Sequence, residues 1–348
     1  MTPDEHPGRP GVAALIDAAL GERVALRHRI GEREGRPLYT DAVGPLSDGG
    51  AGTVVVDTRK GPVRVDRAAV VAVRVVPPAP RRRASWSAVS RLENLCADAW
   101  PAVVDEPLGG WRLRAAGGFT GRANSALAVG DPGLPIDAAL DRVRAFAAEH
   151  GIPTRLQTPM GSPWSEAAAR EGWVLDGGHR AGPEVAVLVA DLTNLAALPS
   201  TAAVELTPDA TDAWWAITGA PESEAERHVL TAAARPGFAV ARAADGTPTG
   251  ALRAAVVEDH LHLSRLATRS AARRQGVGTA LTAAAAAWGL EQGARWAVLQ
   301  VNLQNEGARA LYARLGCTEH HRYHYLAPAR PSRAPGRRAS AGPRGPRA

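Results

Sequence analysis

Alternating apolar and polar positions mark the N-terminal part of the chain. Between residues 21 and 77, short apolar runs cover residues 23–30, 38–46, 52–58, 63–66 and 70–76, with Gly- and Asp-containing turns between them. A period of two predicts strands, and five short strands predict a small antiparallel barrel or rolled sheet. This region is either a nucleic-acid or partner-binding module or a structural appendage. Tyr39 is its only aromatic residue, which argues against a row of side chains that stacks bases.

After a Pro- and Arg-rich stretch, the pattern changes to helices alternating with strands, which predicts an α/β fold. The first stretch predicts helices at 85–100, 136–150 and 163–171, and strands at 111–115, 123–129, 154–158 and from 173 onward. The second predicts helices at 209–218 and 221–234 and a hairpin of 238–243 with 250–257. Both stretches are long enough to bury a core of their own.

A strand, a glycine turn and a helix follow one another in the second stretch. Residues 261–268 alternate leucine with polar residues, 273–278 read Arg-Arg-Gln-Gly-Val-Gly, and 279–292 are rich in Ala and Leu without proline. A helix N-terminus offers unpaired amides and a partial positive charge, which suits a phosphate group. Glycines at 276 and 278 let an anion approach the backbone closely.

A second strand and helix complete the pattern. Residues 296–301 form a nearly unbroken apolar run, typical of a buried parallel strand. Residues 305–316 then predict a helix with Asn at its start and Gly at its end. The two motifs, Arg-x-x-Gly-x-Gly and Asn-x-x-Ala-x-x-Leu-Tyr-x-x-x-Gly, resemble the acetyl-CoA-binding core of the GNAT N-acetyltransferase superfamily. The first half, which has no such glycine turn, resembles a degenerate second copy.

The resemblance implies a GNAT fold, a mixed central sheet flanked by helices, in two tandem halves behind a small β-domain, as in an actinobacterial subfamily. The expected parts are an N-terminal segment (1–20), the β-domain (21–77), a linker (78–84), a degenerate half (85–196), a catalytic half (202–326) and a disordered basic tail (327–348). The net charge of +6 equals the six arginines of that tail. The rest is neutral, which argues against a general polyanion-binding surface.

The resemblance also implies which residues contact acetyl-CoA, the expected acyl-donor cosubstrate. The expected contacts are the backbone of Leu266, Ala267 and Thr268 with the pantetheine arm, the turn residues Arg273, Arg274, Gln275, Gly276, Val277, Gly278 and Thr279 with the pyrophosphate, and Asn305. A plain strand-to-helix turn is the alternative for the glycines, and helix capping is the alternative for Asn305. The third glycine of a dinucleotide fingerprint is replaced by Leu281.

Two residues are candidates for the proton transfers. Tyr312 matches the family tyrosine that protonates the leaving thiolate, although a core aromatic residue would fit the same spacing. The strand 261–268 lacks the carboxylate that many relatives use as a base. His262 is the nearest substitute, against the alternatives of a packed sheet histidine, of Glu258 or Asp259, and of a water chain.

Other clusters carry weaker signals. On an extended strand His320 and His324 share a face while His321 points away, so a closing strand with polar residues is expected here and a metal site is not. Thr120, Arg122 and Asn124 are candidates for the acceptor cleft, or for an ordinary loop. The pair Trp214–Trp215 either walls that cleft or packs in the core.

These observations predict a cytoplasmic N-acetyltransferase that moves an acetyl group from acetyl-CoA to a primary amine in a ternary complex. The alternative is a GNAT-like module that binds acyl-CoA without turnover. The two cysteines suggest reduced thiols, and no apolar run reaches the length of a membrane span. The identity of the amine and the oligomeric state are left open.

Overall fold

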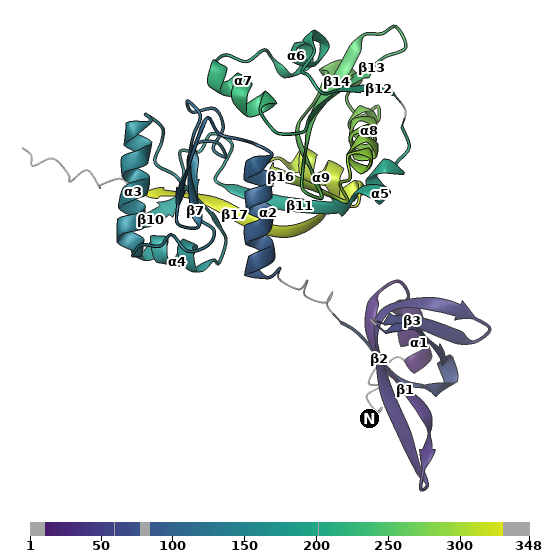
Figure 1. The fold of residues 1–348 in the computed structure, drawn as a ribbon. Coiled ribbons are helices and arrows are strands. Elements are labelled where there is room, and N and C mark those ends of the chain that lie inside the picture. The colour runs from purple at the N-terminus through teal and green to yellow at the C-terminus, as the bar shows by residue number, and fades with distance from the viewer. Residues whose placement is uncertain (1–10, 59, 77–83, 201, 330–348) are drawn as a thin grey trace, which may run out of the picture. The chain divides into compact units, whose positions relative to one another are not determined.

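A computed structural model describes residues 11–58, 60–76, 84–200 and 202–329, which belong to two compact units divided between Arg82 and Arg83 (Figure 1). Residues 1–10 of the expected N-terminal segment, most of the linker and residues 330–348 lie outside the described residues. Each unit is described by itself below.

The N-terminal unit is an antiparallel five-stranded sheet in the order β4-β3-β2-β1-β5 with one short helix. Its elements are α1 (Val12–Ala18), β1 (Arg23–Arg33), β2 (Arg36–Gly50), β3 (Thr53–Thr58), β4 (Gly61–Asp66), the 3-10 turn η1 (Arg67–Ala69) and β5 (Val70–Val75). Alternate side chains such as Val24, Leu26 and Val54 point into a small core with Ile16 of α1. The predicted small β-domain is therefore confirmed as an antiparallel sheet.

The larger unit is built on one mixed sheet of twelve strands. The path runs β12-β13-β14-β15-β16-β11-β17-β9-β8-β7-β6, and β10 pairs with β17 beside it. The strands are β6 (Val104–Leu108), β7 (Trp111–Ala115), β8 (Ser125–Leu127), β9 (Leu156–Pro159), β10 (Trp173–Leu175), β11 (Glu184–Asp191), β12 (Ala203–Thr207), β13 (Pro236–Arg242), β14 (Pro248–Val257), β15 (His260–Thr268), β16 (Trp296–Asn302) and β17 (Thr318–Pro328). The expected α/β class with flanking helices is confirmed.

The two halves of this unit exchange strands. β11 belongs to the first half in sequence but lies between β16 and β17 of the second half, antiparallel to both. β17, drawn in yellow in Figure 1, continues past β11 to pair with β9 and β10 of the first half. Because β17 extends to Pro328, the first residues of the expected tail belong to the sheet. The two halves therefore form one continuous hydrogen-bonded sheet.

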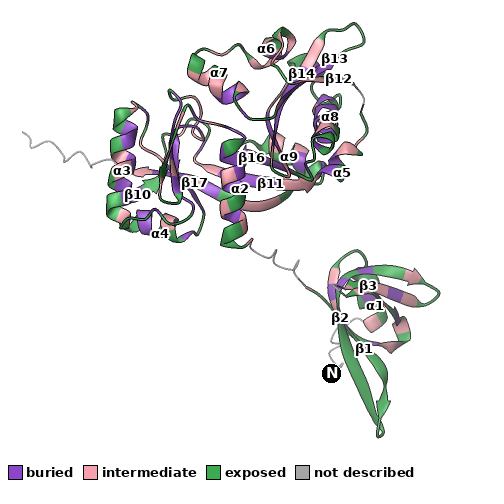
Figure 2. Cartoon of the chain, viewed as in Figure 1, coloured by how far each residue is buried: buried purple, intermediate pink, exposed green. Residues whose placement is uncertain are grey.

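Helices cover both faces of the sheet. They are α2 (Trp86–Asp98), α3 (Ile136–Glu149), α4 (Pro163–Arg170), α5 (Leu192–Ala196), α6 (Asp212–Thr218), α7 (Glu224–Thr231), α8 (Val277–Glu291) and α9 (Glu306–Arg314). Adjacent residues of β16 show that different helices cover the two faces. Leu299 packs in the core with α5, α8 and α9, whereas Val298 packs with Leu92 and Leu95 of α2. The strands beneath α8 are largely buried (Figure 2). No helix among the described residues is long and apolar enough to cross a membrane.

A buried carboxylate joins the first helix to both halves of the sheet. Glu93 of α2 is 1% exposed. Its Oε2 accepts a hydrogen bond from Gln157 Nε2 of β9 at 2.6 Å, and its Oε1 lies 2.8 Å from His321 Nε2 of β17. Gln157 in turn accepts from Arg114 of β7 at 2.8 Å. Three strands and a helix therefore depend on one side chain.

Replacing Glu93 by Ala should destabilise this unit by about 3 kcal/mol, because Gln157 and His321 lose a buried partner. Chemical denaturation would measure the change. Glu149→Ala, at an exposed position of α3, is the matched control and should stay within about 0.5 kcal/mol. Equal stability of the Glu93 variant and the unchanged protein would show that the network is not structural.

Candidate functional site

The sheet opens between β15 and β16. These strands pair in parallel only from His260 with Trp296 to Leu263 with Leu299. Beyond that point β15 continues beside β14 as far as Thr268, and β16 continues beside β11 as far as Asn302. Each strand keeps its outer neighbour and leaves the other, so a gap lined by backbone opens in the middle of the sheet.

A β-bulge bends β15 at the opening. Ala251 of β14 pairs with Ala267 and Arg253 pairs with Ser264, so two residues of β15 stand opposite one of β14. One of them, Arg265, has φ of 54°, which non-glycine residues seldom adopt. Its Nη2 donates to Thr218 O at 2.8 Å, which anchors the bulge to the end of α6. Bulges of this kind redirect a strand next to a site.

The helix that starts beside the gap has no side-chain cap. Its N-cap is Gly276, with φ of 81°, and no side chain accepts from its first turn. The amides of Val277, Gly278 and Thr279 therefore have no partner inside the helix. By contrast, serine, threonine, aspartate or asparagine side chains cap α2, α4, α5, α6, α7 and α9. The open end of α8 is a ready anion site.

A groove of about 1050 Å³ runs from this helix end into the gap. Most of the predicted cofactor residues line it, namely Leu266, Ala267, Thr268, Arg273, Arg274, Gly276, Val277, Gly278, Thr279 and Asn305, as does Tyr312. Gln275 is not part of this wall, and its Nε2 donates back to Ala271 O at 2.9 Å. None of the described residues that line the groove is acidic.

Tyr312 of α9 is buried at the groove wall. Its ring is 4% exposed and packs in the core with Leu299 and Leu315. Burial, with a smaller contribution from Cys317, raises the pKa of the Tyr312 phenol well above its ordinary value. The phenol therefore stays protonated over the whole neutral range and can act as a proton donor.

Asn305 has the capping role that its position predicts. Its Oδ1 accepts from Ala308 N at 3.0 Å at the start of α9, and the residue also lines the groove. One amide side chain can do both, because its Nδ2 is left over from the cap. The capping interpretation is thus borne out by geometry, while a cofactor contact stays a prediction.

His262 lies in the sheet and lines neither of the two large cavities of the site. It is 1% exposed, with its ring 6.4 Å from that of Trp100 and with no well-directed hydrogen bond to either nitrogen. Burial lowers the pKa of His262 well below the ordinary value, and the positive charges of Arg122 and Arg253 lower it further. The nearby Gln300 side chain raises this pKa, but by less. The ring is therefore neutral in the folded chain.

A second cavity of about 990 Å³ adjoins the groove. Gln300 and Asn302 of β16 line both, so the two spaces adjoin at the end of that strand. Loop 117–122 of the first half, residues 178–181, and the start of α7 form most of its wall, with Tyr323 and Tyr325 of β17. Both halves are needed to enclose it.

The loop after β7 is shaped by a buried amide. Asn124 is fully buried, accepts from the amides of Ala116 and Gly118, and donates to the carbonyls of Phe119 and Thr120. Of the three residues that the sequence singled out here, Thr120 and Arg122 line the cavity, and Asn124 folds the loop that carries them.

The remaining candidates lie outside the cavities. Trp214 is fully buried against Phe238, and Trp215 packs on it edge to face, so this pair belongs to the core. His321 bonds Glu93, and His324 lies 2.8 Å from Ser165 Oγ. Among the described residues, no group of three or more His, Cys, Asp or Glu is placed to hold a metal.

Sequence patterns alone missed the junction of the two cavities. Gln300 accepts from Arg122 at 2.9 Å, although 178 positions separate them. The polar Gln300 and Asn302 at the end of an apolar strand were the available signal, because a buried strand does not need them.

The sequence profile described as "Probable histone acetyltransferase Rv0428c C-terminal" matches residues 86–326. The chain belongs to this family. The probable histone acetyltransferase Rv0428c of Mycobacterium tuberculosis is 44% identical over 109 residues. That match spans 31% of this chain and 34% of the relative, so the chain spans about a third of the curated relative that it matches.

A solved structure shows the same fold. A GCN5-related N-acetyltransferase from Kribbella flavida superposes with a TM-score of 0.52 at 18% identity, over 68% of this chain and 94% of that one. A tandem GNAT protein from the clavulanic acid biosynthesis pathway gives a TM-score of 0.44 at 17% identity, over 58% and 74%. The GNAT fold expected from the resemblance is confirmed, and the larger unit belongs to this family.

His262 makes stability fall in mild acid. Its pKa is lowered on folding, so below the ordinary value of ~6.5 the unfolded chain binds more protons than the folded one. The free energy of unfolding should therefore drop between pH 7.5 and 5.5. In His262→Phe that drop should be smaller by about 1 kcal/mol in denaturation curves. An identical drop in both proteins would mean that the folded chain accepts the proton.

Proposed function

We propose that the larger unit transfers an acetyl group from acetyl-CoA to a primary amine by direct transfer in a ternary complex. One observation carries the proposal. The uncapped end of α8 opens on a groove that passes between the parted strands and reaches Tyr312. The helix end suits the pyrophosphate of acetyl-CoA, the parted strands suit its extended, amide-containing arm, and Tyr312 suits its thioester.

The chain supplies three kinds of contact for the donor. The amides at the start of α8 and the exposed guanidinium groups of Arg273 and Arg274 suit the pyrophosphate. The backbone of β15 from Leu266 to Thr268 faces the gap without pairing to β16 and suits the amide groups of the pantetheine arm. Asn305 offers its remaining amide donor. Each of these proposed contacts is transferred from the GNAT motifs only to the residue of this chain that matches the motif position.

Tyr312 is the proposed acid of the reaction. The amine nitrogen bonds to the acetyl carbon as the bond from that carbon to sulfur breaks. Tyr312 then gives its proton to the departing sulfur and regains one from water, which also takes the proton lost by the amine. His262 has no place in this scheme, because burial keeps it from both cavities. The reaction is assigned to the cytoplasm, where the two buried cysteines stay reduced.

The anion site can be tested with two substitutions of equal size. Gly278→Asp and Gly278→Asn both add a side chain toward Leu311, where 3.4 Å is available for the first carbon. The carboxylate favours the start of a helix, so folding is preserved, but it should repel the pyrophosphate. We expect CoA to bind the Asp variant at least 10-fold more weakly than the Asn variant by calorimetry. Equal affinities would remove α8 as the anion site.

The acid can be tested with Tyr312→Phe. We expect kcat to fall about 100-fold while the Kd for CoA changes less than twofold, since only the hydroxyl group is lost. Tyr39→Phe, in the N-terminal unit, is the matched control and should keep full activity. Unchanged kcat in Tyr312→Phe would take this residue out of the mechanism.

The alternative, an acyl-CoA-binding module without turnover, is supported by the absence of acidic residues from the described groove wall. Release of free thiol from acetyl-CoA over a panel of amines separates the two. The name of the related protein suggests a histone lysine as acceptor, and lysine peptides therefore belong in the panel.

A further inference from the structure

We infer that the second cavity takes an acceptor amine that carries an anionic group, a carboxylate or phosphate, bound by Arg122. The inference rests on the proposed acetyl transfer and names the class of its acceptor.

Arg122 is fixed where the two cavities meet. Its Nη1 donates to Gln300 Oε1 at 2.9 Å, and Gln300 lines both spaces. Its guanidinium carbon lies 4.7 Å from the ring centre of Trp100. Trp100 is 1% exposed and is itself held by a 3.0 Å hydrogen bond to Thr120. An anion on Arg122 would therefore lie close to the reacting amine, with little side-chain entropy left to lose.

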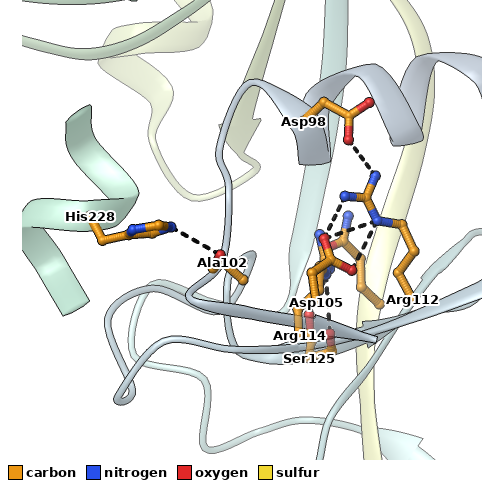
Figure 3. A network of polar contacts seen from close by, with 8 residues as sticks. Asp98, Ala102, Asp105, Arg112, Arg114, Ser125 and His228 are labelled. Carbon is orange, nitrogen blue, oxygen red and sulfur yellow. Dashed lines mark hydrogen bonds and ion pairs between the residues drawn. The ribbon is translucent and has the colours of Figure 1, made fainter. Parts of the chain in front are cut away.

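The charge of Arg122 has no counter-charge in the part of the chain that the structure describes. Its described contacts are the neutral Gln300 and the ring of Trp100. Other guanidiniums of the same half are engaged, since Arg112 pairs with Asp98 and Asp105 (Figure 3) and Arg155 pairs with Asp176 at 2.6 Å. Arg122 keeps further N–H donors in a planar fork that fits a carboxylate or phosphate.

A second cation without an acidic partner contacts the same tryptophan ring. Arg253 of β14 is fully buried, its guanidinium carbon is 5.0 Å from the same Trp100 ring, and its Nη2 has no hydrogen-bond partner. Burial, assisted by Arg122, lowers the pKa of Arg253 to about 9, so it is still cationic near neutral pH. Buried charges without partners are costly. A bound anion would offset that cost.

The acidic residues of the cavity do not neutralise this pair. Glu226 accepts from the amide of Glu222 at 2.9 Å as part of the cap of α7, and Glu222 is exposed. Glu226 acts electrostatically on Arg265. Glu93 is engaged by Gln157 and His321. A lysine-rich segment would thus meet positive charge at the junction, whereas an amine with an adjacent anion would not.

Matched acceptor pairs test the inference. L-alanine and L-alaninamide differ in the carboxylate, and phosphoethanolamine and ethanolamine differ in the phosphate. With the full chain and acetyl-CoA, at least one anionic member should have a kcat/KM about 10-fold or more above that of its neutral partner. The comparison is stringent, because alaninamide has the less basic amine and so the larger reactive fraction. The better pair identifies the anion.

Arg122→Gln should lower kcat/KM for the anionic acceptor about 100-fold and for its neutral partner less than threefold. Arg180→Gln, an exposed guanidinium on the same cavity wall, should keep the preference. The Kd for CoA, measured in parallel, should stay within twofold in both variants.

The outcomes are distinct. No thiol release with any amine would refute the proposed function itself. Turnover of lysine peptides or neutral amines without preference for the anionic partner would refute only the present inference. Equal loss of preference in the Arg122 and Arg180 variants would also refute it, since the effect would then come from the general potential of the cavity.

Discussion

The parting of β15 and β16 is the constraint on which the site depends. A strand pair normally satisfies its amides and carbonyls across the ladder, and unpaired groups inside a protein are costly. Here pairing ends at Leu263 and Leu299, while β14 and β11 hold the outer edges of the two strands. The backbone amides and carbonyls along the inner edges of the two strands therefore do not pair with each other, and they suit a ligand that carries amide groups. The bulge at Arg265 turns that edge away from β16, and the uncapped α8 begins at its mouth.

The exchange of strands explains why the gap can stay open. β16 would be weakly held if its only long partner were β15, which leaves it after four residues. β11 pairs with β16 along seven residues and was contributed by the other half of the unit. β17 then ties β11 to β9, and Glu93 fastens both to α2. The first half lacks a glycine turn of its own, but it supplies a strand to the site and much of the wall of the second cavity.

Local chemistry was readable from the sequence, and long-range pairing was not. The glycine turn at 276–278, the cap at Asn305 and the position of Tyr312 follow from short-range patterns, so much of the groove wall could be outlined in advance. β11 reads as one more apolar strand, and nothing within it says which neighbours it takes. The contact of Arg122 with Gln300 likewise exists only in the folded unit. For His262, alternation likewise shows on which face of β15 the side chain lies but not how deeply it is buried.

The positive charge beside the junction bears on the missing base. An ammonium ion near Arg122 and Arg253 is disfavoured relative to the neutral amine, because like charges oppose its charged form. A site of this kind needs less help from a carboxylate to obtain a nucleophile, and a carboxylate on β15 would pair with those arginines instead. An anion on the acceptor makes both facts compatible, since it is drawn to the guanidinium groups while its own amine stays free to react. The groove wall without acidic residues and the two arginines without acidic partners, Arg122 in the cavity wall and Arg253 buried near it, then have one explanation.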